Sequence, residues 1–169
     1  MAGLPDVAQR TLQATFARML DTCPDDVAHV DATGTWTFAQ SYARSTRLAA
    51  GLASLGVGHQ EPVALLLDNT VDFVHTWMGI GLGGAIEVPV STAYKHRFLA
   101  HVLNDSGSAV LVVEDRYVDR IAEVAADLPH LRTLVVRGDP AAGDALRGSF
   151  TVVPFGQLET AGAITPSAG

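Results

Sequence analysis

Residues 62–70 read PVALLLDNT, and this stretch decides the fold. Its first six positions are all apolar, which is typical of a strand that is buried on both faces of a sheet. The three residues Asp68-Asn69-Thr70 follow at once, and their side chains can accept hydrogen bonds from the free N–H groups at a helix start. The sequence therefore predicts a buried strand that leads directly into a helix over 71–82.

The same order of strand and helix recurs along the chain. Three further apolar runs are rich in β-branched residues, and the segments between them have the length of helices. This alternation implies right-handed crossovers and an α/β fold with a mostly parallel, helix-covered sheet. The expected strands are 62–67, 85–90, 109–113 and 131–136, and the expected helices between them are 71–82, 92–103 and 116–126. Six strand residues are expected to be buried: Leu65, Leu67, Val88, Val110, Val112 and Val135.

The flanking regions contain smaller elements. Thr37 and Gln40 have the spacing of a capping box, which predicts that a helix begins there. The other expected elements are a helix over 6–22, a hairpin with strands at 27–31 and 35–37, a helix over 39–55, a loop over 139–143, a strand over 150–153 and a short helix over 155–159. We expect one domain over 1–159, with its core in 12–136, and a flexible tail over 160–169.

Composition excludes several classes of protein. The chain has 169 residues, 48% of them hydrophobic and 17% charged, which is a globular composition. Its net charge is −7 and it has one lysine, Lys95, so it lacks the basic stripe of a nucleic-acid binder. A lone cysteine, Cys23, cannot form a disulfide framework within the chain. We find no apolar run long enough to span a membrane and no secretory signal, and the cytoplasm is the expected location.

Mean hydropathy is positive, at +0.23, which is high for a small free-standing domain. It indicates apolar surface that something else covers, although a buried sheet also raises it. The expected partners are therefore the remainder of a larger protein or a separate protein partner, and a homo-oligomer is a further alternative.

Glycines and histidines do not form a familiar site. Residues 79–84 read GIGLGG, but they close a helix and precede a strand, whereas a dinucleotide-binding loop follows a strand and opens a helix. Close helix packing and a helix end explain these glycines better. The six histidines are dispersed; His96 and His101 are five residues apart and lie on different helix faces, and His75 reads as a packing or surface residue. We expect no metal site and no catalytic residue.

Three charged groups are candidates for ligand contact. Asp68 and Asn69 follow a core strand, at the edge where open α/β sheets bind ligands, but helix capping is the simpler interpretation. Tyr94, Lys95 and Arg97 form a cationic and aromatic group, and Arg116 and Arg120 lie one helical turn apart. Either group could contact a phosphate, and either could be a solvated face.

Taken in order, several motifs resemble the N-terminal part of the AMP-dependent synthetase and ligase family. Residues 36–43, WTFAQSYA, and 56–65, GVGHQEPVAL, are similar to an early strand-to-helix motif and to the passage from a long helix into a core strand. The strongest stretches are 68–73, DNTVDF, 77–94, WMGIGLGGAIEVPVSTAY, and 98–107, FLAHVLNDSG, which resemble acyl-CoA ligases of the fatty-acyl and carnitine types. The likeness covers about 12–136.

The resemblance implies a cytoplasmic ligase that joins a carboxylate to AMP and then to coenzyme A, with ATP, Mg and coenzyme A as its cofactors. It also suggests that Arg116 and Arg120 contact a phosphate of coenzyme A. The family's Ser/Thr/Gly-rich phosphate loop and its C-terminal catalytic lysine have no counterpart in this sequence, and Lys95 lies in another motif. We therefore expect an N-terminal fragment that binds none of these cofactors alone and is inactive by itself.

Two other functions remain open from the sequence. One is a non-catalytic α/β module, derived from the same family, that binds a protein partner. The other is a small nucleotide-binding domain unrelated to ligases, which the placement of the glycines disfavours.

Overall fold

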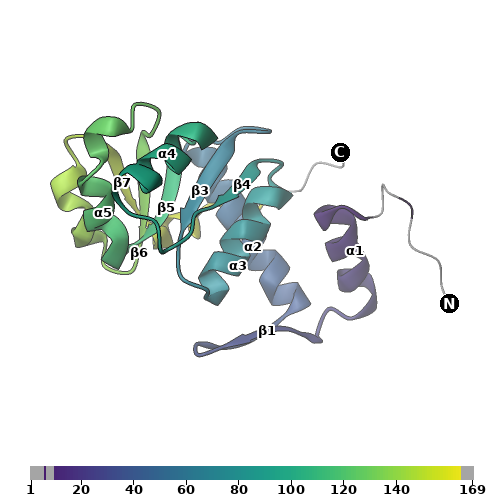
Figure 1. Cartoon of the computed structure of the whole chain (residues 1–169). Coiled ribbons are helices and arrows are strands. Elements are labelled where there is room, and N and C mark those ends of the chain that lie inside the picture. Colours follow the sequence, from purple (N-terminus) through teal and green to yellow (C-terminus); the bar gives the residue numbers. More distant parts are fainter. Residues whose placement is uncertain (1–5, 7–9, 165–169) are drawn as a thin grey trace.

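The computed structural model describes Asp6 and residues 10–164 (Figure 1). Its helices and strands in chain order are α1 (Leu12–Thr22), β1 (Val27–Asp31), β2 (Gly34–Thr37), α2 (Phe38–Ser54), β3 (Pro62–Leu66), α3 (Val71–Leu82), β4 (Ile86–Pro89), α4 (His96–Ser106), β5 (Val110–Glu114), α5 (Val118–Ala122), β6 (Thr133–Arg137), β7 (Thr151–Pro154) and α6 (Phe155–Leu158). Short 3₁₀ helices are η2 (Asp115–Tyr117), η3 (Ala125–Asp127) and η4 (Pro140–Leu146).

Five strands form one parallel sheet in the order β4-β3-β5-β6-β7, and β1 and β2 form a separate antiparallel hairpin. The sheet confirms the predicted α/β class. Because successive side chains of a strand point to opposite faces, a strand covered on both sides is apolar at every position. Strand β3 shows this: Val63, Ala64, Leu65 and Leu66 are all fully buried.

Helices cover the sheet on both faces (Figure 1). The side chains of α4, α5 and η4 pack with alternate strand residues such as Leu66 and Val113 in one core cluster. Those of α2, α3 and α6 pack with the intervening residues, such as Leu65 and Val112, in the other cluster. Helix α1 and the β1–β2 hairpin lie beyond α2 and α3, on the side away from the sheet (Figure 1).

Local signals explain several element boundaries. The Thr37 hydroxyl accepts the Gln40 N–H at 3.2 Å, and the Gln40 side chain accepts the Thr37 N–H at 2.9 Å, which confirms the capping box. A Cβ on Gly79 would come within 2.7 Å of the Ser45 carbonyl oxygen, so α2 and α3 approach too closely there for any side chain. Gly84 has a φ of +77°, in the left-handed region that glycine adopts most easily. The glycine run therefore serves helix packing and the helix end, as predicted.

Some predicted boundaries are wrong. Helix α1 begins at Leu12 and not at residue 6, because the Thr11 hydroxyl caps it by accepting the Ala14 N–H at 3.1 Å. Helix α4 begins at His96 and not at 92, since a turn closed by the Tyr94 N–H and the Ser91 carbonyl at 3.0 Å precedes it. The predicted helix over 116–126 is broken into η2, α5 and η3, and the predicted loop over 139–143 forms the N-cap and first part of η4.

Five of the six residues predicted to be buried are buried. Leu65, Val110, Val112 and Val135 lie in strands, and Leu67 is buried one residue beyond β3. Val88 is only half-buried, because β4 is an edge strand that pairs with β3 alone.

The predicted tail lies partly outside the described residues, which end at 164. Within the described part, the Ile164 N–H donates to the Thr46 carbonyl at 3.4 Å, so the chain returns to α2 after α6. Across the described residues, no helix combines the length and the apolar character that a membrane span requires.

Candidate functional site

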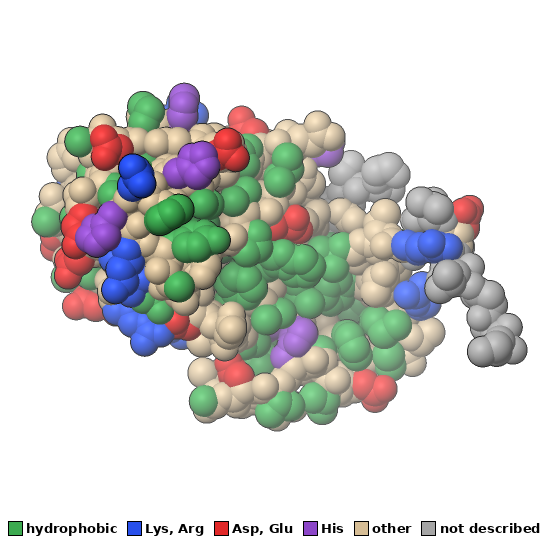
Figure 2. All heavy atoms as spheres, viewed as in Figure 1, with side chains coloured by type: hydrophobic (Ala, Val, Ile, Leu, Met, Phe, Trp, Pro, Cys, Tyr) green, Lys and Arg blue, Asp and Glu red, His purple; other side chains and the backbone are tan. Residues whose placement is uncertain are grey.

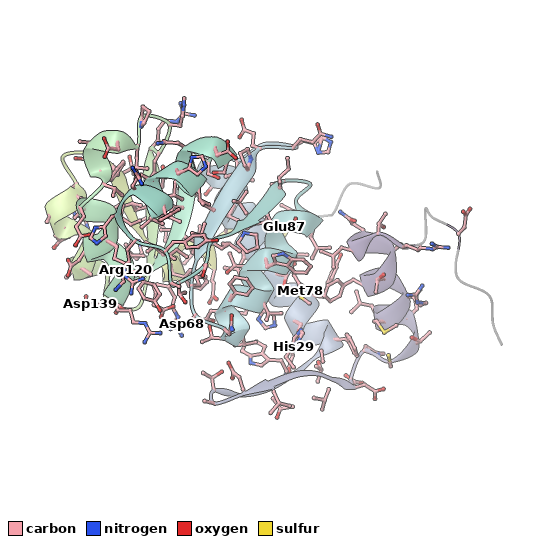
Figure 3. All side chains as sticks on the ribbon, viewed as in Figure 1. His29, Asp68, Met78, Glu87, Arg120 and Asp139 are labelled. Atoms are coloured by element: carbon pink, nitrogen blue, oxygen red, sulfur yellow. The ribbon has the colours of Figure 1, made fainter. Side chains whose placement is uncertain are left out.

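The strand order places a topological switch point between β3 and β5. From β3 the chain crosses to β4 on one side, and from β4 it returns to β5 on the other side of β3. In open parallel sheets, ligands bind in the crevice at the carboxyl ends of the strands where the order reverses. Asp68 follows β3 here, and Glu114, Arg116 and Tyr117 end or follow β5. Figure 3 shows Asp68 and Arg120 on the same side of the molecule.

Asp68 is the anionic centre of this edge. One carboxylate oxygen accepts a hydrogen bond from the Arg116 guanidinium, and the other accepts the Tyr117 hydroxyl at 2.7 Å. Partial burial alone would raise the pKa of Asp68, but the hydrogen bonds from Arg116 and Tyr117 outweigh it, so the pKa lies below its usual value. The carboxylate is therefore ionised at neutral pH.

Helix capping is the wrong interpretation of Asp68. The Val71 N–H at the start of α3 donates to the Asp31 carboxylate of the β1–β2 hairpin at 3.0 Å, and Thr70 makes no side-chain cap. Hydrogen bonds, first from the Thr33 hydroxyl and then from the Val71 and Thr33 N–H groups, lower the pKa of Asp31 to about 2. A residue 40 positions away in the sequence thus caps the helix, and this frees Asp68 for the arginine.

Arg116 and Arg120, the two residues predicted to contact a phosphate, lie over one aromatic ring. The guanidinium carbons of Arg116 and Arg120 are 5.1 Å and 4.4 Å from the ring centroid of Tyr117. Arg120 also donates to the Thr92 carbonyl at 2.6 Å, while Arg116 keeps 59% of its side chain exposed. The structure therefore brings both cations together, on η2 and α5, beside the switch point.

The acidic neighbours in the sequence do not neutralise these arginines. The Asp115 carboxylate accepts the backbone N–H groups of Arg116 at 2.6 Å and of Asp139 at 2.8 Å. Among the described residues, Asp119 takes part in no ion pair. Asp68, which is distant in the sequence, holds Arg116 instead.

A second arginine cluster lies deeper at the same edge. Arg137, the last residue of β6, contacts the carboxylates of Glu114 and of Asp72, the latter at 2.8 Å. Arg44 of α2 contacts Asp72 and Glu159, both at 2.6 Å. Glu114 is buried, and its hydrogen bond raises the pKa of Arg137. These five side chains join α2, α3, β5, β6 and the end of α6, which is a structural role that the sequence analysis missed.

A sequence signal for this buried cluster exists. Glu114 ends the otherwise apolar strand β5, Arg137 ends β6 after three apolar residues, and the two residues are paired in the register of these strands. When two neighbouring buried strands each end in a charged residue of opposite sign, the two side chains are expected to form an ion pair. Tyr117 gives no comparable signal, because its hydrogen-bond partner Asp68 is 49 residues away in the sequence, in the segment that follows β3.

His75 is a packing residue. It is fully buried in α3, with its ring 4.9 Å from that of Trp36 and 5.5 Å from that of His29. Its Nδ1 lies 3.4 Å from an Arg44 nitrogen. Burial and then the Arg44 charge lower the pKa of His75 to about 4, so the ring is neutral at pH 7. Within the described ranges, no three His, Cys, Asp or Glu side chains are grouped to hold a metal ion.

The other candidate group is solvent-exposed. Tyr94, Lys95 and Arg97 all lie on the surface at the start of α4, and Phe98 beside them is 69% exposed. His96 pairs with Glu123 at 3.0 Å, and His101 is exposed on the same helix. The geometry at the switch point is more organised, because the Tyr117 ring and the hydrogen bonds to Asp68 and Thr92 hold both arginines there.

Comparison with known proteins gives a consistent result. The profile of the AMP-binding enzyme family matches residues 16–161. A medium/long-chain-fatty-acid–CoA/3-oxocholest-4-en-26-oate–CoA ligase of Mycobacterium tuberculosis is 36% identical over 128 residues, which cover 76% of this chain and 23% of that ligase. A 4-hydroxybenzoate–CoA/benzoate–CoA ligase of Rhodopseudomonas palustris is 33% identical over 116 residues, which cover 69% of this chain and 22% of that ligase.

The fold agrees with these matches. The crystal structure of the N-terminal domain of FACL13 from Mycobacterium tuberculosis is similar with a TM-score of 0.76, over 93% of this chain and 37% of that one, at 24% identity. The chain spans about a quarter of the length of the curated relatives that it matches. The family match continues past residue 136 through β7 and α6. The chain therefore belongs to the AMP-binding enzyme family, and it resembles the N-terminal part of its acyl-CoA ligases.

Proposed function

We propose that this chain supplies the N-terminal part of an ATP-dependent acyl-CoA ligase, which converts a carboxylate, ATP and coenzyme A into acyl-CoA, AMP and pyrophosphate. The observation that carries the proposal is the family match over 16–161, together with the identity to coenzyme A ligases. ATP, Mg and coenzyme A would be the cofactors of the larger enzyme. The resemblance of residues 77–94 and 98–107 to ligases of the fatty-acyl and carnitine types supports a role in fatty acid metabolism, and the cytoplasmic location remains a prediction.

A segment exchange tests this function. The 128 residues matched in the Mycobacterium tuberculosis ligase are replaced by the corresponding residues of this chain. Because the five-stranded sheet and its helix cover are proposed to be equivalent, the chimaera is expected to keep fatty-acid-dependent ATP–pyrophosphate exchange. A chimaera that folds, as judged by its melting temperature and elution volume, but has no exchange activity would contradict the proposal.

The isolated chain is proposed to be inactive. The sequence has no Ser/Thr/Gly-rich phosphate loop, and its single lysine, Lys95, is exposed at the start of α4. Without positioned cations and N–H groups, the charge that develops at the α-phosphate is not stabilised. Pyrophosphate exchange by the purified chain, above that of a blank without enzyme, would show that the chain is active on its own.

Arg116 and Arg120 are proposed to contact a phosphate of coenzyme A in the larger enzyme. The support is their common position over Tyr117 beside the switch point, with Arg116 largely exposed. In the chimaera, Arg120→Ala is expected to raise the KM for coenzyme A and to leave the KM for ATP unchanged. Equal KM values for coenzyme A in parent and variant would place both arginines on a solvated face.

A second candidate function is a non-catalytic module that binds a protein partner. Exposed apolar surface favours it: Figure 2 shows hydrophobic side chains gathered across the centre of one face. The exposed large hydrophobic residues are Val27, Val30, Trp77, Ile86, Tyr94 and Phe98. In the first proposal, the rest of the ligase covers this surface. A chimaera without activity, combined with concentration-dependent self-association of the chain in sedimentation experiments, would favour the second function.

A further inference from the structure

Asp68, Arg116 and Tyr117 form a closed triangle of contacts. Arg116 donates to one oxygen of the Asp68 carboxylate, the Tyr117 hydroxyl donates to the other at 2.7 Å, and the Arg116 guanidinium lies over the Tyr117 ring. Tyr117 is 7% exposed, so its ring is fixed by the core beneath it. The same ring carries Arg120, with the guanidinium carbon 4.4 Å from its centroid. One buried tyrosine thus fixes the relative position of two surface cations.

The two arginines have unused donors. A guanidinium group has five N–H donors, and Arg120 spends one on the Thr92 carbonyl at 2.6 Å. Arg116 spends its bond on Asp68, which is itself partly exposed, and most of the Arg116 side chain faces solvent. The Asp68 carboxylate that pairs with Arg116 is therefore partly exposed, so a ligand can reach this ion pair.

We infer that Tyr117 and Asp68 are positioning residues for phosphate at this site: Tyr117 holds both guanidinium groups in place, and Asp68 occupies Arg116 until a phosphate displaces it. The inference rests on the proposed function, in which Arg116 and Arg120 face a phosphate of coenzyme A. Carboxylate and phosphate compete for the same donors, because both accept paired hydrogen bonds from a guanidinium group. The Asp68 charge also repels an approaching anion.

The two roles predict opposite effects on anion affinity. Asp68→Asn keeps the shape of the side chain but removes its charge, so it frees Arg116 and tightens binding. A merely structural role would predict weaker binding, because the variant loses an ion pair. Tyr117→Leu removes the aromatic surface under both cations and weakens binding. Tyr117→Phe keeps the ring and removes one hydrogen bond to Asp68, so its affinity is expected to equal or slightly exceed that of the parent.

The experiment has two arms. One is an NMR titration of the arginine side-chain N–H signals of the isotope-labelled chain with inorganic pyrophosphate, and the other is a calorimetric titration of the chimaera with coenzyme A. Asp68→Asn is expected to tighten binding by up to about fivefold, the factor that corresponds to a partly exposed ion pair. Tyr117→Leu is expected to weaken it by about fivefold, as for the loss of a cation–aromatic contact. Asp105→Asn is the matched control, because Asp105 is an exposed aspartate near the end of α4, at the opposite edge of the sheet. It is expected to leave both affinities unchanged.

Each outcome has a distinct meaning. Equal or weaker binding of both probes by a folded Asp68→Asn variant overturns the inference, and so does a lack of pyrophosphate binding by parent and variant alike. If pyrophosphate binds more tightly to Asp68→Asn but coenzyme A binds to neither protein, the coenzyme A assignment fails and the inference stands. If coenzyme A binds equally to both proteins, the assignment stands and the inference fails. Should Asp68→Asn not fold, weaker binding of pyrophosphate by Tyr117→Phe would overturn the inference instead.

Discussion

Two arginine–carboxylate clusters lie at the carboxyl edge of one sheet, and they differ in burial more than in chemistry. In the deep cluster, Arg137 pairs with a Glu114 side chain that is 6% exposed. In the surface cluster, Arg116 is 59% exposed where it meets Asp68. Removing one partner of a buried pair leaves an uncompensated charge, whereas water readily replaces a partner at the surface. Because the deep cluster is buried, it stabilises the packing of the elements that it joins. The surface cluster is exposed, and its arginine is available to a ligand.

The largest expected effect is the loss of unfolding free energy when a carboxylate without an ion-pair partner is placed in this core. Val112→Asp places one in β5, two residues before Glu114, at a fully buried position within an apolar core cluster. The variant is expected to lose more than about 4 kcal/mol of unfolding free energy and to fail to fold in soluble form. Circular dichroism and the soluble yield measure the outcome. A soluble variant with the parent's melting temperature would refute the burial of this strand.

The second-largest loss of stability is expected when one ion-pair partner of the deep cluster is removed. Arg137→Met keeps much of the side-chain volume and leaves Glu114 and Asp72 without this partner. The free energy of unfolding in urea is expected to fall by about 3 kcal/mol, as for a broken buried pair. The double variant Arg137→Met/Glu114→Gln is expected to recover part of the loss, because it removes the unpaired charge. A loss below about 1 kcal/mol would place Arg137 in the surface class.

Acid is expected to destabilise the deep cluster through His75, which contacts Arg44. The pKa of His75 is about 4 in the folded chain against an ordinary value of 6.5, so the unfolded chain binds more protons between these values. Stability is then complete above pH 6.5 and falls as the pH drops towards 4, by on the order of 3 kcal/mol for a shift of this size. Urea titrations at several pH values measure the slope.

The control for this pH dependence is His75→Gln, which cannot take up the proton. It is expected to flatten the slope between pH 6.5 and 4, although it can lower stability at all pH values because the site is buried. His29, Asp31 and Asp72 also face His75 electrostatically. An unchanged slope in His75→Gln would assign the titration to His29, whose pKa is also lowered by burial.

The smallest expected effect on stability belongs to the surface cluster. Asp68→Asn is expected to change the free energy of unfolding by less than about 1 kcal/mol, because both partners are partly exposed. Urea unfolding at pH 7 beside Arg137→Met gives a direct comparison of the two clusters. A loss of unfolding free energy as large as that of Arg137→Met would mean that both clusters stabilise the fold.

Much of the fold could be predicted, because its strongest signals are local. The apolar runs around Leu65, Val112 and Val135 are long enough to indicate strands buried on both faces. The capping box formed by Thr37 and Gln40 marks the start of α2, and all of its residues lie within one four-residue stretch. Helix α4 begins later than the predicted start at or just after Thr92, because the turn that precedes it depends on how the chain leaves the edge strand β4.

The candidate site was only half predictable. Arg116 and Arg120 stand out because a helical turn separates them, which is a local relation. Asp68 was assigned to the helix that follows it, since nothing nearby in the sequence shows that Asp31 of the hairpin caps that helix. Tyr117 contacts Arg116 and Arg120 locally, but its hydrogen bond to Asp68, 49 residues away in the sequence, exists only in the fold.

The sequence by itself determined the α/β class, the alternation of strands and helices that implies a parallel sheet, and the family resemblance. All of these follow from spacing and residue type along the chain. Tertiary structure alone decided which strands are neighbours, where the switch point lies, and which of the two arginine clusters is buried. The physical reason is that burial and charge pairing depend on distance in space. Asp68 and Arg116 are 48 residues apart in the sequence and in direct contact in the fold.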